Sequence, residues 1–282
     1  MKIALLLAAL CLLLASQAFT FQRLLVDAPD SEEGLWWAAQ DIAVLSSLPP
    51  EVVTPFQGEL DANDIVVSWS DSPHWGAVSP LLPADLDLSR LGEEGFALVP
   101  RGEGALVVGF TRTGCLYGLI ELRQRLDDGR PLLTGKLETS TPMLRYRGEA
   151  GSFPFWLGTT MYANQWSGYG PTEQTTDWWW FDEANWCRHF QQLACGRQNA
   201  LVYWHPHPYP ALVTVPGYPE AQYFSPELQE AYRKQFHWIL DIAARYGVRI
   251  YLLTWNICLT PKFAEAQGIP EFGADTPLVR DY

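Results

Sequence analysis

The chain has 282 residues, of which 48% are hydrophobic and 18% are charged, a composition typical of a globular protein long enough for two domains. Its formal net charge of -13 at pH 7 argues against nucleic acid or an anionic membrane as a partner, because both need a basic surface. The charge is compatible with a neutral ligand. The 13 tryptophans favour carbohydrate, since sugar rings stack on aromatic side chains, although tryptophan is also a large core residue.

Residues 1–18 have the pattern of a secretory signal peptide. Lys2 is followed by an unbroken apolar run that ends in small residues at Ala15–Ala18. The run is too short to span a membrane comfortably, and no other segment has the length and hydrophobicity of a membrane span. We therefore expect a secreted or periplasmic protein, with a mature chain of 264 residues once residues 1–18 are removed.

Four cysteines remain after this segment. None of them has the spacing of a zinc site, and their scatter does not indicate a disulfide scaffold. An exported protein permits a disulfide, and the sequence leaves open whether any pair forms one. These cysteines are Cys115, Cys187, Cys195 and Cys258.

The first part of the mature chain predicts a small accessory α/β domain over residues 20–138. A hairpin is expected at 95–110, because two apolar runs flank the turn sequence Arg101–Gly104. Two amphipathic helices are expected on one face of a partly antiparallel sheet. The expected strands are 23–26, 65–69, 95–100, 105–110 and 135–138, and the expected helices are 31–48 and 113–126. Residues 139–142 are the predicted linker.

From residue 143 the pattern changes to helices that lead directly into apolar strands. Asp182 and Ser225 are expected N-caps, and Gly196 and Gly247 are expected helix ends. The aromatic, glycine-rich segment 153–181 is too long for an ordinary connection, so it is either a binding loop or a structural loop. The expected strands are 144–151, 200–205 and 248–255, and the expected helices are 183–195, 225–246 and a short one near 263–267.

Helix-to-strand units of this kind predict a parallel β/α architecture with its site at the carboxyl ends of the strands. We expect an α/β fold in which a small mixed-sheet domain precedes the first three or so βα units of a (β/α)₈ barrel in residues 143–282. A closed barrel takes roughly 250 residues. The strand 248–255 is expected to be buried on both faces. The sequence thus predicts the front part of a longer protein; the rival interpretation is a complete small α/β domain, or an oligomer that pairs the strand edge.

Five residues near strand ends are candidates for sugar binding. Arg147 could donate two hydrogen bonds to hydroxyls or a carboxylate, or form a salt bridge within the barrel. Glu149 could accept from a hydroxyl or act as an acid or base, or form an ion pair with Arg147. His205 could offer a hydrogen bond or transfer a proton. Trp255 could stack on a sugar or pack the barrel end, and Asn256 could bind hydroxyls.

The sequence offers little sign of a metal or a cofactor. His205 and His207 alternate after a predicted strand, but no third ligand is spaced to complete a metal site. There is no glycine-rich phosphate loop and no Gly-x-Ser-x-Gly motif. We therefore predict neither a metal nor a cofactor, and no nucleotide-binding or serine-hydrolase activity.

Several segments resemble two families of glycoside hydrolases, the family 67 α-glucuronidases and the family 20 β-hexosaminidases. In both families an N-terminal α/β domain precedes a catalytic TIM barrel. The segments similar to that N-terminal domain are Glu94–Leu98, Val107–Gly109, Thr113–Gly118 and Leu122–Gln124. Arg145–Gly148 resembles the first barrel strand of family 20, whose arginine contacts sugar hydroxyls. Tyr246–Leu252, with Asn256 and Thr276–Leu278, resembles the third strand and loop of family 67.

The resemblance implies an exported glycoside hydrolase that acts on polysaccharide or oligosaccharide. The catalytic carboxylates of such enzymes lie on the fourth and later barrel strands, which the resemblance places beyond Tyr282, so this chain alone is expected to be inactive. The family 20 aspartate that follows Arg-Gly is absent, because Glu149–Gly151 stands there. The alternative hypothesis is a non-catalytic carbohydrate-binding or interaction protein that uses its aromatic loops alone.

Overall fold

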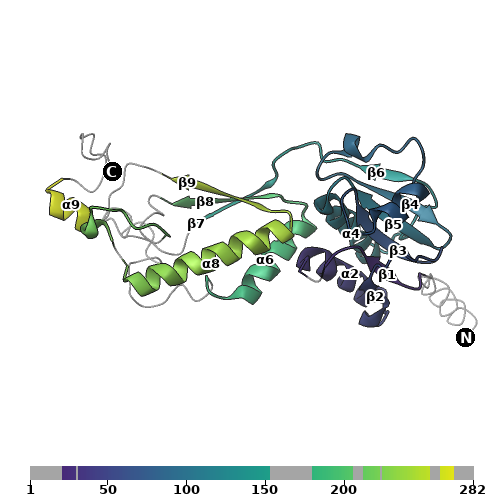
Figure 1. Cartoon of the computed structure of the whole chain (residues 1–282), viewed down its shortest axis with the longest axis horizontal. Coiled ribbons are helices and arrows are strands. Elements are labelled where there is room, and N and C mark those ends of the chain that lie inside the picture. The colour runs from purple at the N-terminus through teal and green to yellow at the C-terminus, as the bar shows by residue number, and fades with distance from the viewer. Residues whose placement is uncertain are drawn as a thin grey trace, which may run out of the picture. The chain divides into compact units, whose positions relative to one another are not determined.

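The structure is a computed structural model that describes residues 21–29, 31–152, 180–205, 212–222, 224–254 and 261–269. The expected signal segment and most of the predicted loop 153–181 lie outside these residues. The chain divides between Arg145 and Tyr146 into two compact units. Each unit has its own sheet (Figure 1).

The first unit, residues 1–145, contains a six-stranded mixed sheet with the strand order β2-β1-β3-β5-β4-β6. Strands β2, β1, β3 and β5 are parallel, whereas β4 pairs antiparallel with both β5 and β6. The strands are β1 (Leu24–Val26), β2 (Val53–Pro55), β3 (Ile65–Trp69), β4 (Phe96–Arg101), β5 (Gly104–Gly109) and β6 (Glu138–Ser140). The mixed α/β class predicted from the sequence is therefore confirmed.

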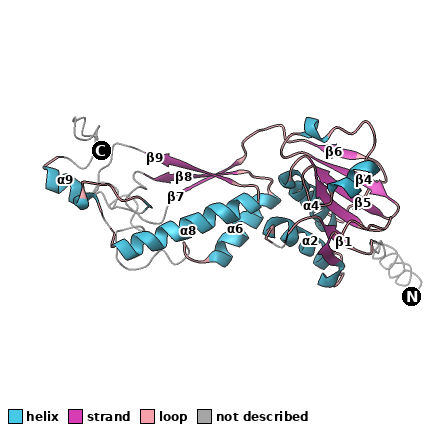
Figure 2. Cartoon of the chain, viewed as in Figure 1, coloured by secondary structure: helices cyan, strands magenta, loops and turns pink. Residues whose placement is uncertain are grey.

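Two long helices, α2 (Glu33–Leu45) and α4 (Arg112–Asp127), pack against each other beside this sheet, as expected (Figure 2). The segment between β3 and β4 holds α3 (Trp75–Val78) and the 3₁₀ turns η2 (Ser79–Leu81) and η3 (Leu88–Leu91). Its apolar side chains pack on alternate residues of the strands, so both faces of β3 and β5 are buried. A further 3₁₀ turn, η1 (Pro50–Val52), leads into β2.

The second unit, residues 146–282, contains a parallel sheet with the order β7-β8-β9. This is the arrangement expected of the start of a β/α barrel. Helices α6 and α8 lie on one side of the sheet (Figures 1 and 2). The elements are β7 (Gly148–Ser152), α6 (Glu183–Cys195), β8 (Ala200–His205), η4 (Pro219–Ala221), α8 (Pro226–Arg245), β9 (Arg249–Thr254) and α9 (Pro261–Gln267).

Helix caps and a glycine contact fix the ends of these elements. The Asp182 carboxylate accepts from the Asn185 N–H at 2.9 Å, and the Ser225 hydroxyl accepts from the Leu228 N–H at 3.2 Å, which confirms both predicted N-caps. The first strand was expected from Leu144, but β7 begins at Gly148. A Cβ at Gly148 would lie 1.8 Å from the Ala200 carbonyl oxygen, so only glycine allows this approach of β7 to β8.

An aromatic cluster joins α6, α8 and β8. Trp180, which is fully buried, lies with its ring centroid 5.5 Å from that of Trp186 and 6.3 Å from that of Tyr203. It also stacks on Phe236 of α8 at 6.2 Å. These contacts hold both helices on the same side of the sheet, and they identify that side as the helix-facing one.

In the described part of the chain, no helix is both long enough and apolar enough to cross a membrane.

Candidate functional site

The carboxyl edge of the parallel sheet is where sequence analysis expected a sugar site. Strand β8 ends at His205, which pairs with Thr254 at the end of β9, so the backbones of these two residues meet at that edge. Trp255 and Asn256 directly follow β9 and lie outside the described residues, as does the side chain of His205. The predicted sugar contacts of these three residues therefore stay predictions.

Arg147 lies at the opposite edge. It precedes β7, and its carbonyl oxygen accepts from the N–H groups of Asn199 and Ala200 at the amino end of β8. Its Nε donates to the Arg197 carbonyl oxygen at 2.7 Å. Ligands of parallel β/α sheets bind at the carboxyl ends of the strands. Arg147 thus binds the turn between α6 and β8. This position does not support the predicted contact of Arg147 with sugar.

Glu149 points to the helix-facing side of β7. Its Oε1 lies 3.0 Å from Nε2 of His189, a residue of α6. The alternative interpretation of Glu149 was an ion pair with Arg147, but the partner in the structure is His189. Successive residues of an extended chain face opposite sides, so Glu149 and Arg147, which precedes β7 by one residue, lie on the same side but two residues apart.

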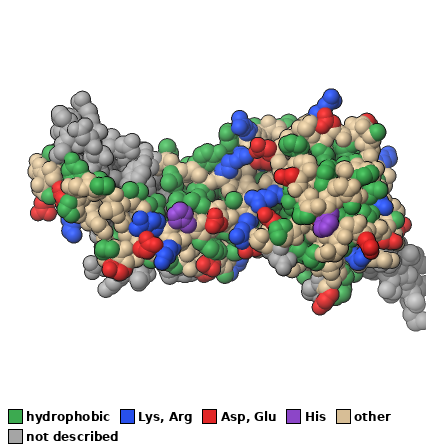
Figure 3. All heavy atoms as spheres, viewed as in Figure 1, with side chains coloured by type: hydrophobic (Ala, Val, Ile, Leu, Met, Phe, Trp, Pro, Cys, Tyr) green, Lys and Arg blue, Asp and Glu red, His purple; other side chains and the backbone are tan. Residues whose placement is uncertain are grey.

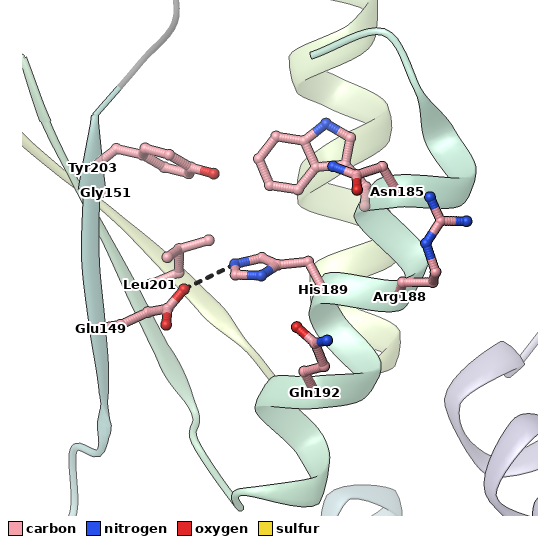
Figure 4. Close-up of a pocket in the computed structure, with 9 residues that line it drawn as sticks. Glu149, Gly151, Asn185, Arg188, His189, Gln192, Leu201 and Tyr203 are labelled. Atoms are coloured by element: carbon pink, nitrogen blue, oxygen red, sulfur yellow. Dashed lines mark ion pairs between the residues drawn. The ribbon is translucent and has the colours of Figure 1, made fainter. Parts of the chain in front are cut away.

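A cavity of about 320 Å³ surrounds the Glu149–His189 pair, between β7 and α6 (Figure 4). Strands β7 and β8 line one side of the cavity and α6 lines the other. The strand residues are Glu149, Gly151, Leu201 and Tyr203, and the helix residues are Asn185, Trp186, Arg188, His189 and Gln192. In Figure 4 the side chain of Glu149 extends from β7 toward the imidazole of His189, and that of Tyr203 extends from its strand toward α6. We call this site the β7–α6 pocket.

The pocket is polar at its mouth and aromatic at its base. Glu149 and His189 have side chains that are 46% and 31% exposed, whereas Trp186 and Tyr203 are buried. Burial raises the pKa of the Tyr203 phenol, and the nearby negative charge of Glu149 raises it further. Tyr203 is therefore a neutral hydroxyl at physiological pH. The described residues that line the pocket offer hydrogen-bond donors and acceptors, and Glu149 is the one carboxylate among them, whereas glycoside hydrolysis usually needs a pair of carboxylates.

The residues that α6 contributes to this pocket were not predicted from the sequence. Asn185, Arg188, His189 and Gln192 follow the spacing i, i+3, i+4, i+7, which places them on one flank of the helix. The buried face of the same helix carries Trp186, Phe190 and Leu193. The sequence therefore shows a polar stripe on α6 next to its apolar stripe. Nothing in the sequence indicates that this polar stripe meets Glu149, which is 40 positions away from His189.

Among the described residues, no group of three or more His, Cys, Asp or Glu side chains is arranged to hold a metal ion. Cys115 is a buried thiol in α4, Cys187 and Cys195 lie in α6, and Cys258 lies outside the described residues.

Replacing His189 with glutamine is expected to lower the free energy of unfolding by only about 0.5 kcal/mol, because a half-exposed ion pair contributes little. Glu149→Gln should cost about the same, and the double variant should cost less than the two changes added together, since the pair is lost only once. Urea titrations of the four proteins would measure this coupling. His237→Gln, an exposed histidine on α8, is the matched control. Strict additivity of the two single variants would contradict a direct pairing.

Comparisons with known proteins show similarity at the level of the fold. No family model matches the chain, and no curated protein matches it. A solved GH138 enzyme that targets pectin rhamnogalacturonan II is similar at a TM-score of 0.65 and 19% identity, over 92% of this chain and 28% of that enzyme. A GH115 4-O-methyl-α-glucuronidase matches at a TM-score of 0.46 and 18% identity, over 81% of this chain and 28% of that one.

A third structure, the N-acetyl-β-hexosaminidase of Streptomyces plicatus, matches at a TM-score of 0.47 and 12% identity, over 93% of this chain and 50% of that one. The chain thus spans between about a quarter and a half of the length of these enzymes. At 19% identity the similarity to the GH138 enzyme concerns the fold alone. The chain has a glycoside-hydrolase-like fold: a mixed α/β unit followed by parallel β/α units.

Proposed function

We propose that this chain is part of an exported glycoside hydrolase that acts on polysaccharide or oligosaccharide, with a substrate of the α-glucuronide or N-acetylhexosaminide type. The observation that carries the proposal is the fold shared with the GH138 enzyme over 92% of the chain at a TM-score of 0.65. The first unit would be the accessory domain, and the second unit would begin the catalytic barrel. The secretory pattern of residues 1–18 supports export.

The sugar would bind at the carboxyl edge of β7, β8 and β9. His205 ends β8, and Trp255 and Asn256 directly follow β9 in the sequence, which supports assigning all three to the edge where ligands bind in parallel β/α folds. An indole can stack on a sugar ring, and an amide can donate to one hydroxyl while it accepts from another. Arg147 and Glu149 are left out of this site, because one lies at the amino edge and the other faces α6.

The catalytic step would need a pair of carboxylates that the described residues of β7, β8 and β9 do not supply at that edge. Glycoside hydrolysis uses one carboxylic acid to protonate the leaving oxygen and a second carboxylate as nucleophile or base. Among the described residues of β7, β8 and β9, Glu149 is the acidic one, and it is paired with His189 on the helix-facing side. We therefore propose that the catalytic pair belongs to further β/α units, and that this chain contributes sugar binding.

The test combines binding and hydrolysis. Titration of the chain with a panel of oligosaccharides that includes uronic acids and N-acetylhexosamines is expected to show binding without release of reducing sugar. Trp255→Ala should weaken this binding about tenfold, since it removes the stacking surface. Asn256→Ala should weaken it as well, while Asn63→Ala in the first unit should leave it unchanged.

Two outcomes would contradict the proposal. Failure of a correctly folded chain to bind any glycan would remove the sugar site. Hydrolysis by the chain itself would mean that its own residues supply the carboxylate pair. Sequencing the gene beyond codon 282 separates the hydrolase from the alternative, a carbohydrate-binding protein: the hydrolase requires further strand–helix units with carboxylates at the strand ends.

A further inference from the structure

The topology of the first unit favours a ligand site at the carboxyl ends of β1 and β3. These two strands are neighbours, and the chain leaves them toward opposite faces of the sheet. Helix α2 follows β1 and packs on α4, whose Gly118 lies directly against Val107. The segment after β3 packs on the other face, where Val78 and Leu88 contact the cluster that contains Leu106. In open α/β sheets, ligands bind outside the carboxyl ends of the strands at such a switch point.

A buried carboxylate and a surface histidine meet at this switch point. Asp27 directly follows β1, and its side chain is 1% exposed. His74 lies in the segment that follows β3, and its side chain is 39% exposed. The Asp27 carboxylate lies 2.8 Å from Nδ1 of His74 and accepts from the His74 backbone N–H at 3.0 Å. A fully buried acid therefore holds an imidazole that reaches the surface.

The contact with Asp27 decides which nitrogen of His74 carries the proton. A carboxylate can only accept hydrogen bonds, so Nδ1 of His74 is the N–H that donates to it. In a neutral imidazole, Nε2 is then a bare acceptor. The ring of Phe56, which is buried, lies 5.6 Å from the imidazole at an angle of 72° and limits its rotation. In the described part of the chain no group donates to Nε2, which is not buried, so this acceptor is open to a ligand.

The carboxylate of Asp27 does not need the imidazole for its own hydrogen bonds. The hydroxyls of Ser68 and Ser72 donate to it at 2.9 and 2.6 Å, and the His74 backbone N–H is a third donor. These donors already satisfy a buried carboxylate. The fourth contact, from Nδ1, orients a ring at the surface. A carboxylate on one nitrogen orients ligand-binding histidines in the same way.

Charge at this edge favours a neutral ligand over an anion. The carboxylate of Asp27 places a negative charge behind His74. Arg112, the cation at the start of α4, is already paired with Glu32 at 2.6 Å. Figure 3 shows acidic and basic side chains interspersed on one face of the first unit. A bare imidazole nitrogen accepts from a hydroxyl, whereas an anion offers it no proton. The ligand that fits is a neutral molecule with hydroxyl groups.

An exposed aromatic ring and the width of the edge suit a sugar. Phe110 directly follows β5 and is 41% exposed. The Ser70 hydroxyl, just after β3, donates to the Phe110 carbonyl oxygen at 2.7 Å and so joins the ends of the two strands. Neighbouring strands are about 4.8 Å apart, so the ends of β1 and β5 are about 10 Å apart, a width that a short oligosaccharide can cover. Sugar rings stack on aromatic side chains.

We propose that the carboxyl edge of β1, β3 and β5 is a second glycan-binding site. In this site Nε2 of His74 accepts from a sugar hydroxyl, and the ring of Phe110 stacks on a sugar ring. Asp27 is a positioning residue, because it fixes the orientation and the protonated nitrogen of His74. The first unit would then hold a glycan independently of the edge of β7, β8 and β9. The choice of a sugar among hydroxylated ligands rests on the proposed function, whereas the placement of the site does not.

Two substitutions of His74 separate ligand binding from a structural role. Asparagine places its amide near the position of Nδ1, so His74→Asn keeps a donor for Asp27 and loses the outward acceptor. Glutamine places its amide near the position of Nε2, so His74→Gln keeps an outward acceptor and loses the donor. His74→Asn should therefore bind glycan about tenfold more weakly at nearly unchanged stability in urea. His74→Gln should retain more of the binding and be the less stable of the two.

The measurement is an NMR titration of the 282-residue chain with short neutral oligosaccharides, with uronic-acid oligosaccharides of the same length as the charged comparison. The neutral sugars are expected to shift the backbone amides of residues 70–74. Phe110→Ala should weaken this binding about tenfold, since it removes the stacking ring. Phe181→Ala is its matched control, because Phe181 is 40% exposed and lies in the second unit. His237→Asn, at an exposed histidine of α8, is the control for His74→Asn.

The tautomer of His74 tests the role of Asp27. At about pH 8, above the ordinary titration range of histidine, the imidazole nitrogen signals should show the proton on Nδ1. His74→Asn identifies these signals, because His74 is the one histidine within residues 1–145. Asp27→Ala should abolish the preference for Nδ1, since the acceptor is gone. A proton on Nε2 in the unsubstituted chain would turn the acceptor into a donor and overturn the proposal.

Three results of the titration would also overturn it. These are unchanged binding by His74→Asn, no shift of residues 70–74 with any oligosaccharide, and tighter binding of the uronic-acid sugars at these residues.

Trp255→Ala separates this inference from the proposed function. If residues 70–74 respond to sugar equally with and without this substitution, while signals of the second unit never respond, the second site stands and the sugar edge of the proposed function fails. If glycan binding depends on Trp255 and residues 70–74 never respond, the proposed function stands and the second site fails.

Discussion

Replacing Trp180 with alanine is expected to lower the free energy of unfolding of the second unit by about 4 kcal/mol, a large share of what a domain of this size has. Trp180 is fully buried, and its ring touches side chains from α6, β8 and α8. Its carbonyl oxygen also accepts from Trp186 Nε1 at 2.9 Å. The alanine variant would leave a cavity at the point where both helices meet the sheet.

The measurement is hydrogen exchange of peptides from 200–205 and 226–245 in increasing urea, which reports on this unit alone. Phe181→Ala is the matched control, because Phe181 is the next residue and is aromatic but exposed, and it should cost below about 1 kcal/mol. Peptides from the first unit should be unaffected. Equal costs for the two substitutions would show that the cluster around Trp180 does not hold the unit together.

Replacing Asp27 with alanine is expected to lower the free energy of unfolding of the first unit by about 3 kcal/mol. Asp27 follows β1 and is 1% exposed. Its carboxylate accepts from the Ser68 hydroxyl at 2.9 Å, from the Ser72 hydroxyl at 2.6 Å, and from both the backbone N–H and Nδ1 of His74. The variant would leave two buried serine hydroxyls and the two half-buried donors of His74 without this acceptor at the junction of β1, β3 and α3.

Hydrogen exchange of peptides from 65–69 and 105–109 in urea would measure the loss. Asp71→Ala is the control, since this carboxylate is exposed and lies in the loop that carries Ser72 and His74. Asp27→Asn should also destabilise the unit, because an amide donor would face groups that are themselves donors. If Asp27→Ala and Asp71→Ala had equal effects, the buried carboxylate would not organise this junction.

Local sequence signals determined the ends of several elements. The strand 200–205 and the helix 183–195 are confirmed at their predicted limits. Asp182 and Ser225 cap the helices that follow them, because a short acceptor side chain satisfies an N–H that the helix leaves open. Gly247 has a φ of 72° just after α8, as a helix-ending glycine should. At the end of α6, however, the left-handed residue is Arg197 (φ 49°) and not Gly196.

Only the tertiary structure decided on which face, and at which edge, of the parallel sheet each side chain lies. Hydrophobicity alone predicted that β9 is buried on both faces, but Tyr251, Leu252 and Leu253 are 39%, 43% and 52% exposed, because burial depends on what packs on each face of the sheet and not on the pattern of one strand. Arg147 was expected at a binding edge, but the start of β7 at Gly148 places it at the amino end, since register is a property of paired strands. Glu149 and His189 meet only because α6 crosses back over β7. Caps and short elements depend on neighbours in sequence, whereas faces, edges and the β7–α6 pocket depend on contacts between distant segments.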